Sequence, residues 1–188
     1  MDNHNQLFFN QYFDLIAEKI RQIDLELIHK TIQMIKALET TNNKIILAGN
    51  GGSAAMASHV SVDFTKVAGI RAINFNEADL ITCFANDYGY EKIFEKAIDF
   101  YGDNGDLLIL ISSSGNSANV INAAQRAKQK KMGIITFTGF DKDNLLKKEG
   151  DVNFWVDSKA YNIVEMTHHV WLLSFVDNIV GKIEYPAN

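Results

Sequence analysis

The sequence predicts an α/β protein with a doubly wound, mainly parallel sheet of five strands flanked by helices. Short apolar runs alternate with amphipathic segments along the chain, and turn residues bound each run. Residues 45–48 and 108–111 are apolar throughout, as expected for strands that are covered on both faces. A loop of Gly, Asn and Ser follows each run, and a helix-like stretch follows each loop. This alternation is typical of parallel sheets, which bind ligands at the carboxyl ends of their strands.

The elements follow from this pattern in order. We predict strands at 44–48, 71–75, 107–112, 133–137 and 152–156. We predict helices at 54–67, 78–86, 92–100, 117–130, 144–149 and 161–180. The 188 residues suit one domain (1–188), with N-terminal helices over 1–40 and an α/β core over 41–188.

Apolar residues recur at three- and four-residue steps from about 6 to 38, which predicts amphipathic helix with a break near Asp24. Leu7, Phe8 and Tyr12 widen the apolar stripe beyond what one contact needs. Two explanations remain open at this stage. The stripe either forms an oligomer interface or packs on the sheet.

Composition excludes several classes of protein. Apolar residues make up 47% and charged residues 22%, which is ordinary for a globular protein. The net charge of −5 argues against a general nucleic-acid binder. Cys83 is the single cysteine, so neither a disulfide framework nor a thiolate metal site is expected. No apolar run approaches a membrane span, and Met1 is not followed by a basic signal-peptide start, so we expect a cytoplasmic protein that binds no membrane.

Two strand-to-helix loops carry the clearest sign of a ligand site. Residues 49–53 read Gly-Asn-Gly-Gly-Ser, and residues 112–117 read Ser-Ser-Ser-Gly-Asn-Ser. Glycine lets the backbone approach a ligand, and each following helix start offers unpaired N–H groups to an anion. Such loops also occur as plain turns with serine caps. Because two lie at strand ends, we expect a phosphorylated small molecule; neither loop has the spacing of a nucleotide-binding motif.

Three further groups of residues could carry chemistry. His59 and Asp63 are four residues apart and share one face of a predicted helix, where they could share a metal, a proton or only a hydrogen bond. Glu165 precedes His168 and His169 by three and four residues, and two adjacent histidines point about 100° apart. At most one of them is therefore expected to face a given pocket. The segment 86–90, Asn-Asp-Tyr-Gly-Tyr, is interpreted as a turn.

These residues resemble the sugar isomerase (SIS) domain family, and within it the phosphoheptose isomerases, which interconvert sedoheptulose 7-phosphate and glycero-manno-heptose 7-phosphate. The resemblance spans nearly the whole chain. Its most specific motifs are segments 49–55, 85–90 and 111–120, and the last differs from the family signature by having Ser113 in place of threonine. The resemblance implies an SIS fold and a homotetramer.

The resemblance also implies roles for individual residues. The residues expected to hold the sugar phosphate are Ser53, Ser112, Ser113, Ser114 and Ser117. Those expected to contact the sugar chain are Asn50, Gly51, Gly52, Asn86 and Asp87. His59 matches a zinc-binding histidine of the family, and Asp63 stands where the family has a glutamate that acts as metal ligand or base.

The last helix departs from the family pattern. With Glu165 aligned to the family glutamate, Val164 replaces a glutamine and Leu172 replaces a histidine. Neither side chain can bind a metal or transfer a proton, so of the family zinc ligands only His59 and Asp63 remain. His168 or His169 could supply a displaced acid.

We therefore expect a phosphosugar aldose–ketose isomerase of the phosphoheptose type that works through an enediol(ate) and supplies heptose for surface polysaccharide. Asp63 or Glu165 would be the base, and His59, His168 or His169 would protonate or polarise the oxygen. The alternative is a non-catalytic SIS module, either a phosphosugar-binding regulator or an adaptor like the replication-initiator-associating homologue. A bound zinc ion is implied only in part, because this sequence lacks two of the residues that bind zinc in the family.

Overall fold

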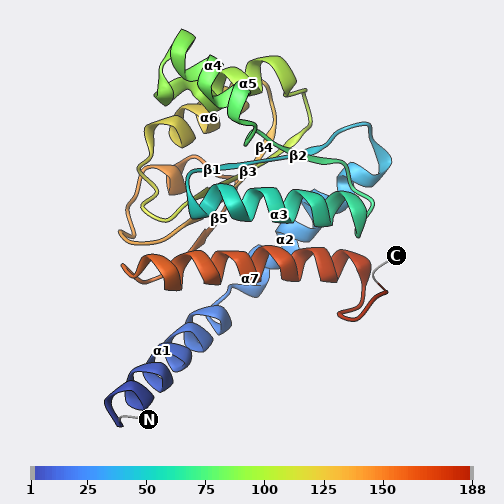
Figure 1. Ribbon diagram of the computed structural model, residues 1–188. Coiled ribbons are helices and arrows are strands. Elements are labelled where there is room, and N and C mark those ends of the chain that lie inside the picture. The colour runs from blue at the N-terminus through green and yellow to red at the C-terminus, as the bar shows by residue number, and fades with distance from the viewer. Residues whose placement is uncertain (1–2, 187–188) are drawn as a thin grey trace.

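The computed structural model describes residues 3–186, which form a five-stranded parallel sheet covered by helices on both faces (Figure 1). The strand order is β2-β1-β3-β4-β5. The strands are β1 (Ile45–Gly49), β2 (Ala72–Asn74), β3 (Leu107–Ser112), β4 (Gly133–Thr138) and β5 (Val152–Trp155). The helices are α1 (Asn3–Arg21), α2 (Leu25–Lys36), α3 (Gly52–Lys66), α4 (Ala78–Tyr88), α5 (Ile93–Tyr101), α6 (Ala118–Gln129) and α7 (Tyr161–Val180). The predicted doubly wound sheet is confirmed.

Strand side chains alternate between two apolar layers. Ile45 and Leu47 of β1 face the layer under α2, α3 and α7, whereas Ile46 and Ala48 face the layer under α5 and α6. All five residues of β1 and all six of β3 are buried, as the unbroken apolar runs predict. β1 and β3 are thus packed on both faces, and this packing fixes the position of the loops at their carboxyl ends.

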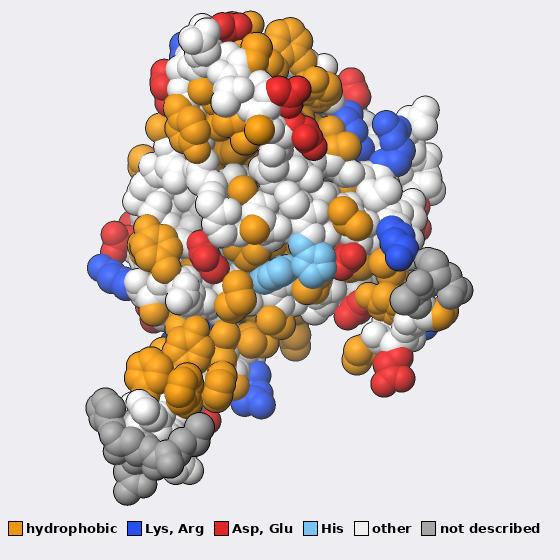
Figure 2. Space-filling model, in the orientation of Figure 1, with side chains coloured by type: hydrophobic (Ala, Val, Ile, Leu, Met, Phe, Trp, Pro, Cys, Tyr) orange, Lys and Arg blue, Asp and Glu red, His pale blue; other side chains and the backbone are white. Residues whose placement is uncertain are grey.

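The two N-terminal helices meet at Asp24, where the sequence predicts a break. The Asp24 carboxylate accepts a hydrogen bond from the Glu26 backbone N–H (2.8 Å) and so begins α2. Helix α1 projects from the body and touches it along α7, where the Trp171 indole donates to the carbonyl of Ile20 (2.9 Å) (Figure 1). Apolar side chains crowd the projecting helix (Figure 2). The most exposed of them on α1 are Leu7, Phe8, Phe9 and Phe13, each at least half exposed.

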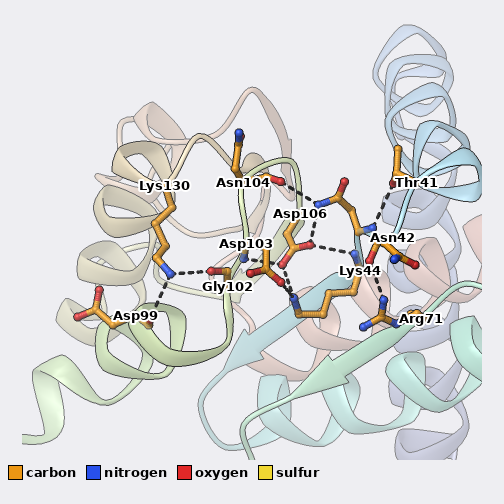
Figure 3. A network of polar contacts seen from close by, with 11 residues as sticks. Thr41, Asn42, Lys44, Arg71, Asp99, Gly102, Asp103, Asn104, Asp106 and Lys130 are labelled. Carbon is orange, nitrogen blue, oxygen red and sulfur yellow. Dashed lines mark hydrogen bonds and ion pairs between the residues drawn. The ribbon is translucent and has the colours of Figure 1, made fainter.

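A buried ion pair ties the amino ends of β1 and β3 together (Figure 3). The Lys44 ammonium lies 2.6 Å from Asp106, which is fully buried, and 2.7 Å from Asp103. Asp106 also accepts the backbone N–H of Lys44 (3.0 Å) and of Asp103 (2.9 Å). Burial alone lowers the pKa of Lys44, but the hydrogen bonds to Asp103 and Asp106 outweigh it and raise the pKa above its usual range.

The structure differs from the predicted elements in two places. Residues 144–149 form only a short 3₁₀ turn, Leu146–Lys148, because the Leu146 N–H bonds to the carbonyl of Gly115 (2.9 Å) instead of starting a longer helix. Asn86 and Asp87 belong to the last turn of α4, which continues to Tyr88 before Gly89 adopts φ +88° and ends it. Within residues 3–186, no helix is long and apolar enough to cross a membrane.

Candidate active site

A cavity of about 140 Å³ opens where the loops after β1 and β3 diverge. The chain leaves β1 toward β2 on one side and returns to β3 on the other, so the strand order reverses here. Ligands of open α/β sheets bind at such switch points. The lining residues are Asn50, Ser53, Ile111, Ser112, Ser113, Ser114, Ser117, Tyr161 and Glu165. A larger hollow of about 310 Å³ between α5 and α6 is less suited to a ligand, because its cations Lys96 and Arg126 are already paired with Asp99.

The loop after β3 arranges serine hydroxyls around the start of α6. The Ser112 and Ser117 hydroxyl oxygens lie 3.3 Å apart, and the Gly115 N–H donates to Ser112 Oγ (3.2 Å). Ser117 is the N-cap residue of α6, yet its hydroxyl makes no capping bond to the backbone. The Ser113 hydroxyl is buried and has no hydrogen-bond partner among the described residues. Serine hydroxyls beside a helix N-terminus suit an anion.

Asn50 fixes the loop after β1 against α6. Its amide Nδ2 donates to Asn119 Oδ1 (3.0 Å), and Asn119 Nδ2 donates back to Asn50 Oδ1 (2.9 Å). The Tyr90 hydroxyl donates to the same Asn50 oxygen (3.0 Å). This reciprocal pair holds the two loops at a fixed separation and sets the width of the cavity.

Glu165 of α7 brings the only carboxylate among the described residues that line the cavity. It lies against Gly52, the first residue of α3, where an added Cβ would overlap the carboxylate. Gly51 just before it has φ +55°, a conformation that glycine adopts readily. The N-terminus of α3, with its positive partial charge, therefore faces the Glu165 carboxylate.

His59 and His169 meet across the seam between α3 and α7. Nδ1 of His59 lies 3.0 Å from Nε2 of His169, and the rings are perpendicular at 85°. Nε2 of His59 lies 3.4 Å from the Asp63 carboxylate. Burial, together with the charge of His59, lowers the pKa of His169, and Asp63 opposes part of that effect. Figure 2 shows histidine side chains gathered over α3 and α7 with acidic side chains nearby.

The structure separates the two adjacent histidines of α7. His168 is fully buried, and its Nε2–H donates to the Thr138 carbonyl (3.0 Å). Burial lowers its pKa to about 4, which the hydrogen bond to Thr138 only partly offsets. His169 instead follows Glu165 by one turn, about 6 Å along the helix. Only His169 of the two lies on the side of α7 that meets α3.

Other predicted site residues lie apart from the cavity. Asn86 and Asp87 are exposed at the end of α4, where the Asn86 amide donates to the Asp87 carboxylate (2.9 Å), and neither lines the cavity within this chain. Tyr161 lines it, although the sequence did not draw attention to it. Its position four residues before Glu165, on the same helix face, was the available signal.

The residues present do not fit the zinc site that the resemblance implies. Both ring nitrogens of His59 already face protein partners, His169 and Asp63. Val164 and Leu172 are fully buried and carry no donor atom. Among residues 3–186, no cluster of three or more His, Cys, Asp or Glu side chains could hold a metal ion. We therefore assign no metal-dependent step to these residues.

The fold and the cavity together define a doubly wound α/β domain with a polar ligand site at the β1–β3 switch point. The SIS domain model matches residues 9–139. The phosphoheptose isomerase of Fusobacterium nucleatum is 36% identical to this chain over 165 residues, which is 85% of this chain and 84% of the relative. The phosphoheptose isomerase of Colwellia psychrerythraea is 38% identical over 166 residues, which is 84% of each chain. The phosphoheptose isomerase structure from Neisseria gonorrhoeae superposes with a TM-score of 0.84 at 29% identity, covering 94% of this chain and 97% of that one. The chain belongs to the SIS domain family.

Proposed function

We propose that this protein is a phosphosugar aldose–ketose isomerase that acts on sedoheptulose 7-phosphate. Its relatives from Fusobacterium nucleatum and Colwellia psychrerythraea are phosphoheptose isomerases, and they match it over more than four fifths of its length. The observation that carries the proposal is that Glu165 shares one small cavity with the loop at residues 112–117, here called the serine loop. A group able to take a proton thus stands beside groups able to hold a phosphate.

The phosphate occupies the end of the cavity formed by the serine loop. Ser112, Ser113 and Ser117 offer hydroxyls there, and the N–H groups at the start of α6 add the positive end of its dipole. Asn50 and Ser53 face the sugar from the loop after β1. These contacts bind the substrate by its phosphate end, which does not react. The binding energy thereby holds the carbonyl end beside Glu165.

Glu165 is the base in this proposal. It removes a proton from C1 of the ketose, the resulting enediol(ate) carries its charge on the former carbonyl oxygen at C2, and the proton returns to C2. Transfer of the O1 proton to O2 completes the aldose. The Glu165 carboxylate is held in place because it lies against Gly52 and cannot move toward α3.

The imidazole pair stabilises the charge that develops on oxygen. A hydrogen bond from a ring N–H strengthens as the carbonyl oxygen becomes an enediolate. His169 is one turn beyond Glu165 and is held by His59, which is held in turn by Asp63. Nε2 of His169 faces His59, so Nδ1 is the ring atom left to act as the donor, and it acts from beside the residues that line the cavity; His59 and Asp63 position the ring. The family zinc has no role in these steps.

The same relatives argue against a purely non-catalytic module, because those relatives are enzymes. The cavity also keeps the carboxylate that isomerisation needs, and the His59–His169 pair lies one turn further along α7, outside the residues that line the cavity. A regulator or adaptor would require none of these groups.

We also propose that the chain works as a homotetramer in the cytoplasm. Helix α1 leaves Phe8, Phe9 and Phe13 at least half exposed, and a patch of this kind on a projecting helix is typical of an interface. A second copy of α1 would cover it. Native mass spectrometry would measure the number of copies, and the substitution Phe13→Glu should shift the assembly toward monomer.

Proton NMR of sedoheptulose 7-phosphate in D2O tests the isomerase proposal. The wild-type chain should introduce deuterium at the carbon next to the carbonyl and produce the aldose. Glu165→Gln should abolish both, whereas the control Glu184→Gln, an exposed residue beyond α7, should behave as wild type. Deuterium incorporation by Glu165→Gln at the wild-type rate would overturn the assignment of the base.

A further inference from the structure

Tyr161 closes the α7 side of the cavity. It is the first residue of α7 and stands one turn before Glu165, so both side chains project from one face of the helix. Both line the cavity together with the serine loop. The tyrosine is 60% exposed, which places its ring at the mouth of the cavity.

The ring of Tyr161 is held in place by Phe140. The ring centroids are 4.8 Å apart and the planes are nearly perpendicular, at 80°. Phe140 has φ +53°, a conformation that is uncommon for a bulky residue and is often retained near functional sites. The preceding Gly139 N–H donates to the carbonyl of Ser113 (2.9 Å). One short segment therefore braces both the serine loop and Tyr161.

The charges around the cavity explain why a further donor matters. Among the described residues that line the cavity, Glu165 is the only charged one, and none is a lysine or an arginine. A phosphate entering this cavity exchanges water for neutral donors alone, so the loss of any one donor is costly. A tyrosine hydroxyl can supply such a hydrogen bond.

We propose that Tyr161 is a substrate-binding residue whose hydroxyl donates a hydrogen bond to the phosphate group of the bound phosphosugar. Its ring, buttressed by Phe140, covers that end of the ligand. The identity of the sugar rests on the proposed isomerase function, but the phosphate contact does not.

Calorimetric titration with two ligands tests this contact, using sedoheptulose 7-phosphate and inorganic phosphate. Tyr161→Phe keeps the ring and its packing on Phe140 and removes only the hydroxyl. We expect it to raise the Kd of both ligands about tenfold, the scale of a lost hydrogen bond to a charged group. Tyr161→Ala should raise both further. Tyr101→Phe is the matched control, because Tyr101 is a half-exposed residue at the end of α5 that packs on Phe75, outside the cavity.

Kinetics separate binding from chemistry. If the hydroxyl holds the phosphate equally in the ground and transition states, Tyr161→Phe raises KM about tenfold and leaves kcat within about threefold. Wild-type affinity for inorganic phosphate in Tyr161→Phe would overturn the proposal, as would a fall in kcat at unchanged Kd. No binding of inorganic phosphate to the wild-type chain would also overturn it. Tight binding of both ligands without turnover would instead contradict the isomerase function and leave the Tyr161 contact measurable.

Discussion

The carboxylate of Glu165 occupies the space that a side chain at position 52 would need. Gly52 begins α3, and a Cβ built there would overlap both carboxylate oxygens. The absence of a side chain at Gly52 therefore lets α3 and α7 approach closely enough for a helix N-terminus to face the carboxylate. This contact also locks Glu165 in the direction of the serine loop, with which it shares the cavity.

Replacing Gly52 by alanine should separate activity from stability. The new methyl group would displace the Glu165 carboxylate, and a misplacement of about 1 Å can lower kcat about 100-fold. The clash is with the end of a flexible side chain, and the helix propensity of alanine offsets part of it, so the free energy of unfolding should change by less than about 1 kcal/mol. Isomerase assays and urea unfolding measure the two effects. An alanine variant with wild-type kcat would show that the position of Glu165 does not limit turnover.

The two histidines of the α3–α7 seam should act as a unit. Because His59 holds His169 at 3.0 Å, we expect His59→Asn and His169→Asn each to lower kcat about 100-fold. The double variant should be little worse than either single one, since both disrupt the same donor. His29→Asn is the control, an exposed histidine on α2 that pairs with Gln33. Multiplicative losses in the double variant would mean that the histidines act independently.

Stability should fall as the medium becomes acidic, in part because of His168. Its pKa in the folded chain is about 4 against an ordinary 6.5, so the unfolded chain takes up the proton first. His168 therefore contributes about 3 kcal/mol to the free energy of unfolding above pH 6.5, and this contribution is lost as the pH falls from 6.5 to 4. His168→Gln keeps a side-chain donor for Thr138 and should flatten this part of the profile in urea unfolding. An unchanged difference between pH 7 and pH 4.5 in the variant would exclude His168 as the cause.

The ion pair at the amino ends of β1 and β3 should affect folding and leave catalysis unchanged. Asp106→Asn breaks the buried pair with Lys44, which keeps only Asp103 as a carboxylate partner, and should lower the free energy of unfolding by about 3 kcal/mol. Turnover per folded molecule should not change, because the cavity lies at the opposite ends of these strands. Asp141→Asn is the control: it removes the exposed pair with Lys159, which should contribute at most about 1 kcal/mol.

Removal of metal should leave turnover intact. The chain lacks the donors of a family zinc site at Val164 and Leu172, and the remaining His59 is engaged by two protein partners. We expect dialysis against a chelator to leave kcat unchanged, and elemental analysis of the purified protein to find well under one equivalent of zinc. A chelated enzyme that loses activity and regains it with zinc would contradict this prediction.

The fold could be predicted because its signals are local. Unbroken apolar runs at β1 and β3 and the capping residue Asp24 act over a few neighbours in sequence, and the structure agrees with each. Residues 144–149 were predicted wrongly as a helix, because a distant carbonyl, that of Gly115, captures the N–H of Leu146. No local pattern reveals such a partner.

The site was less accessible to sequence reasoning, because tertiary packing selects which side chains converge. The order of His168 and His169 predicted that they diverge, but only the fold shows which one enters the core. Tyr161 lies outside the motifs, and its role depends on Phe140, which another segment contributes. Asn119 lies in the 111–120 motif, but its pairing with Asn50 was not predicted.

The location of the Lys44–Asp106 pair has an evolutionary consequence. The pair joins the amino ends of β1 and β3, whereas the cavity lies at their carboxyl ends. Loop residues such as Ser113 can therefore be exchanged one at a time without shifting β1 against β3. Sequence change at the cavity is thereby uncoupled from the alignment of the two strands that support it.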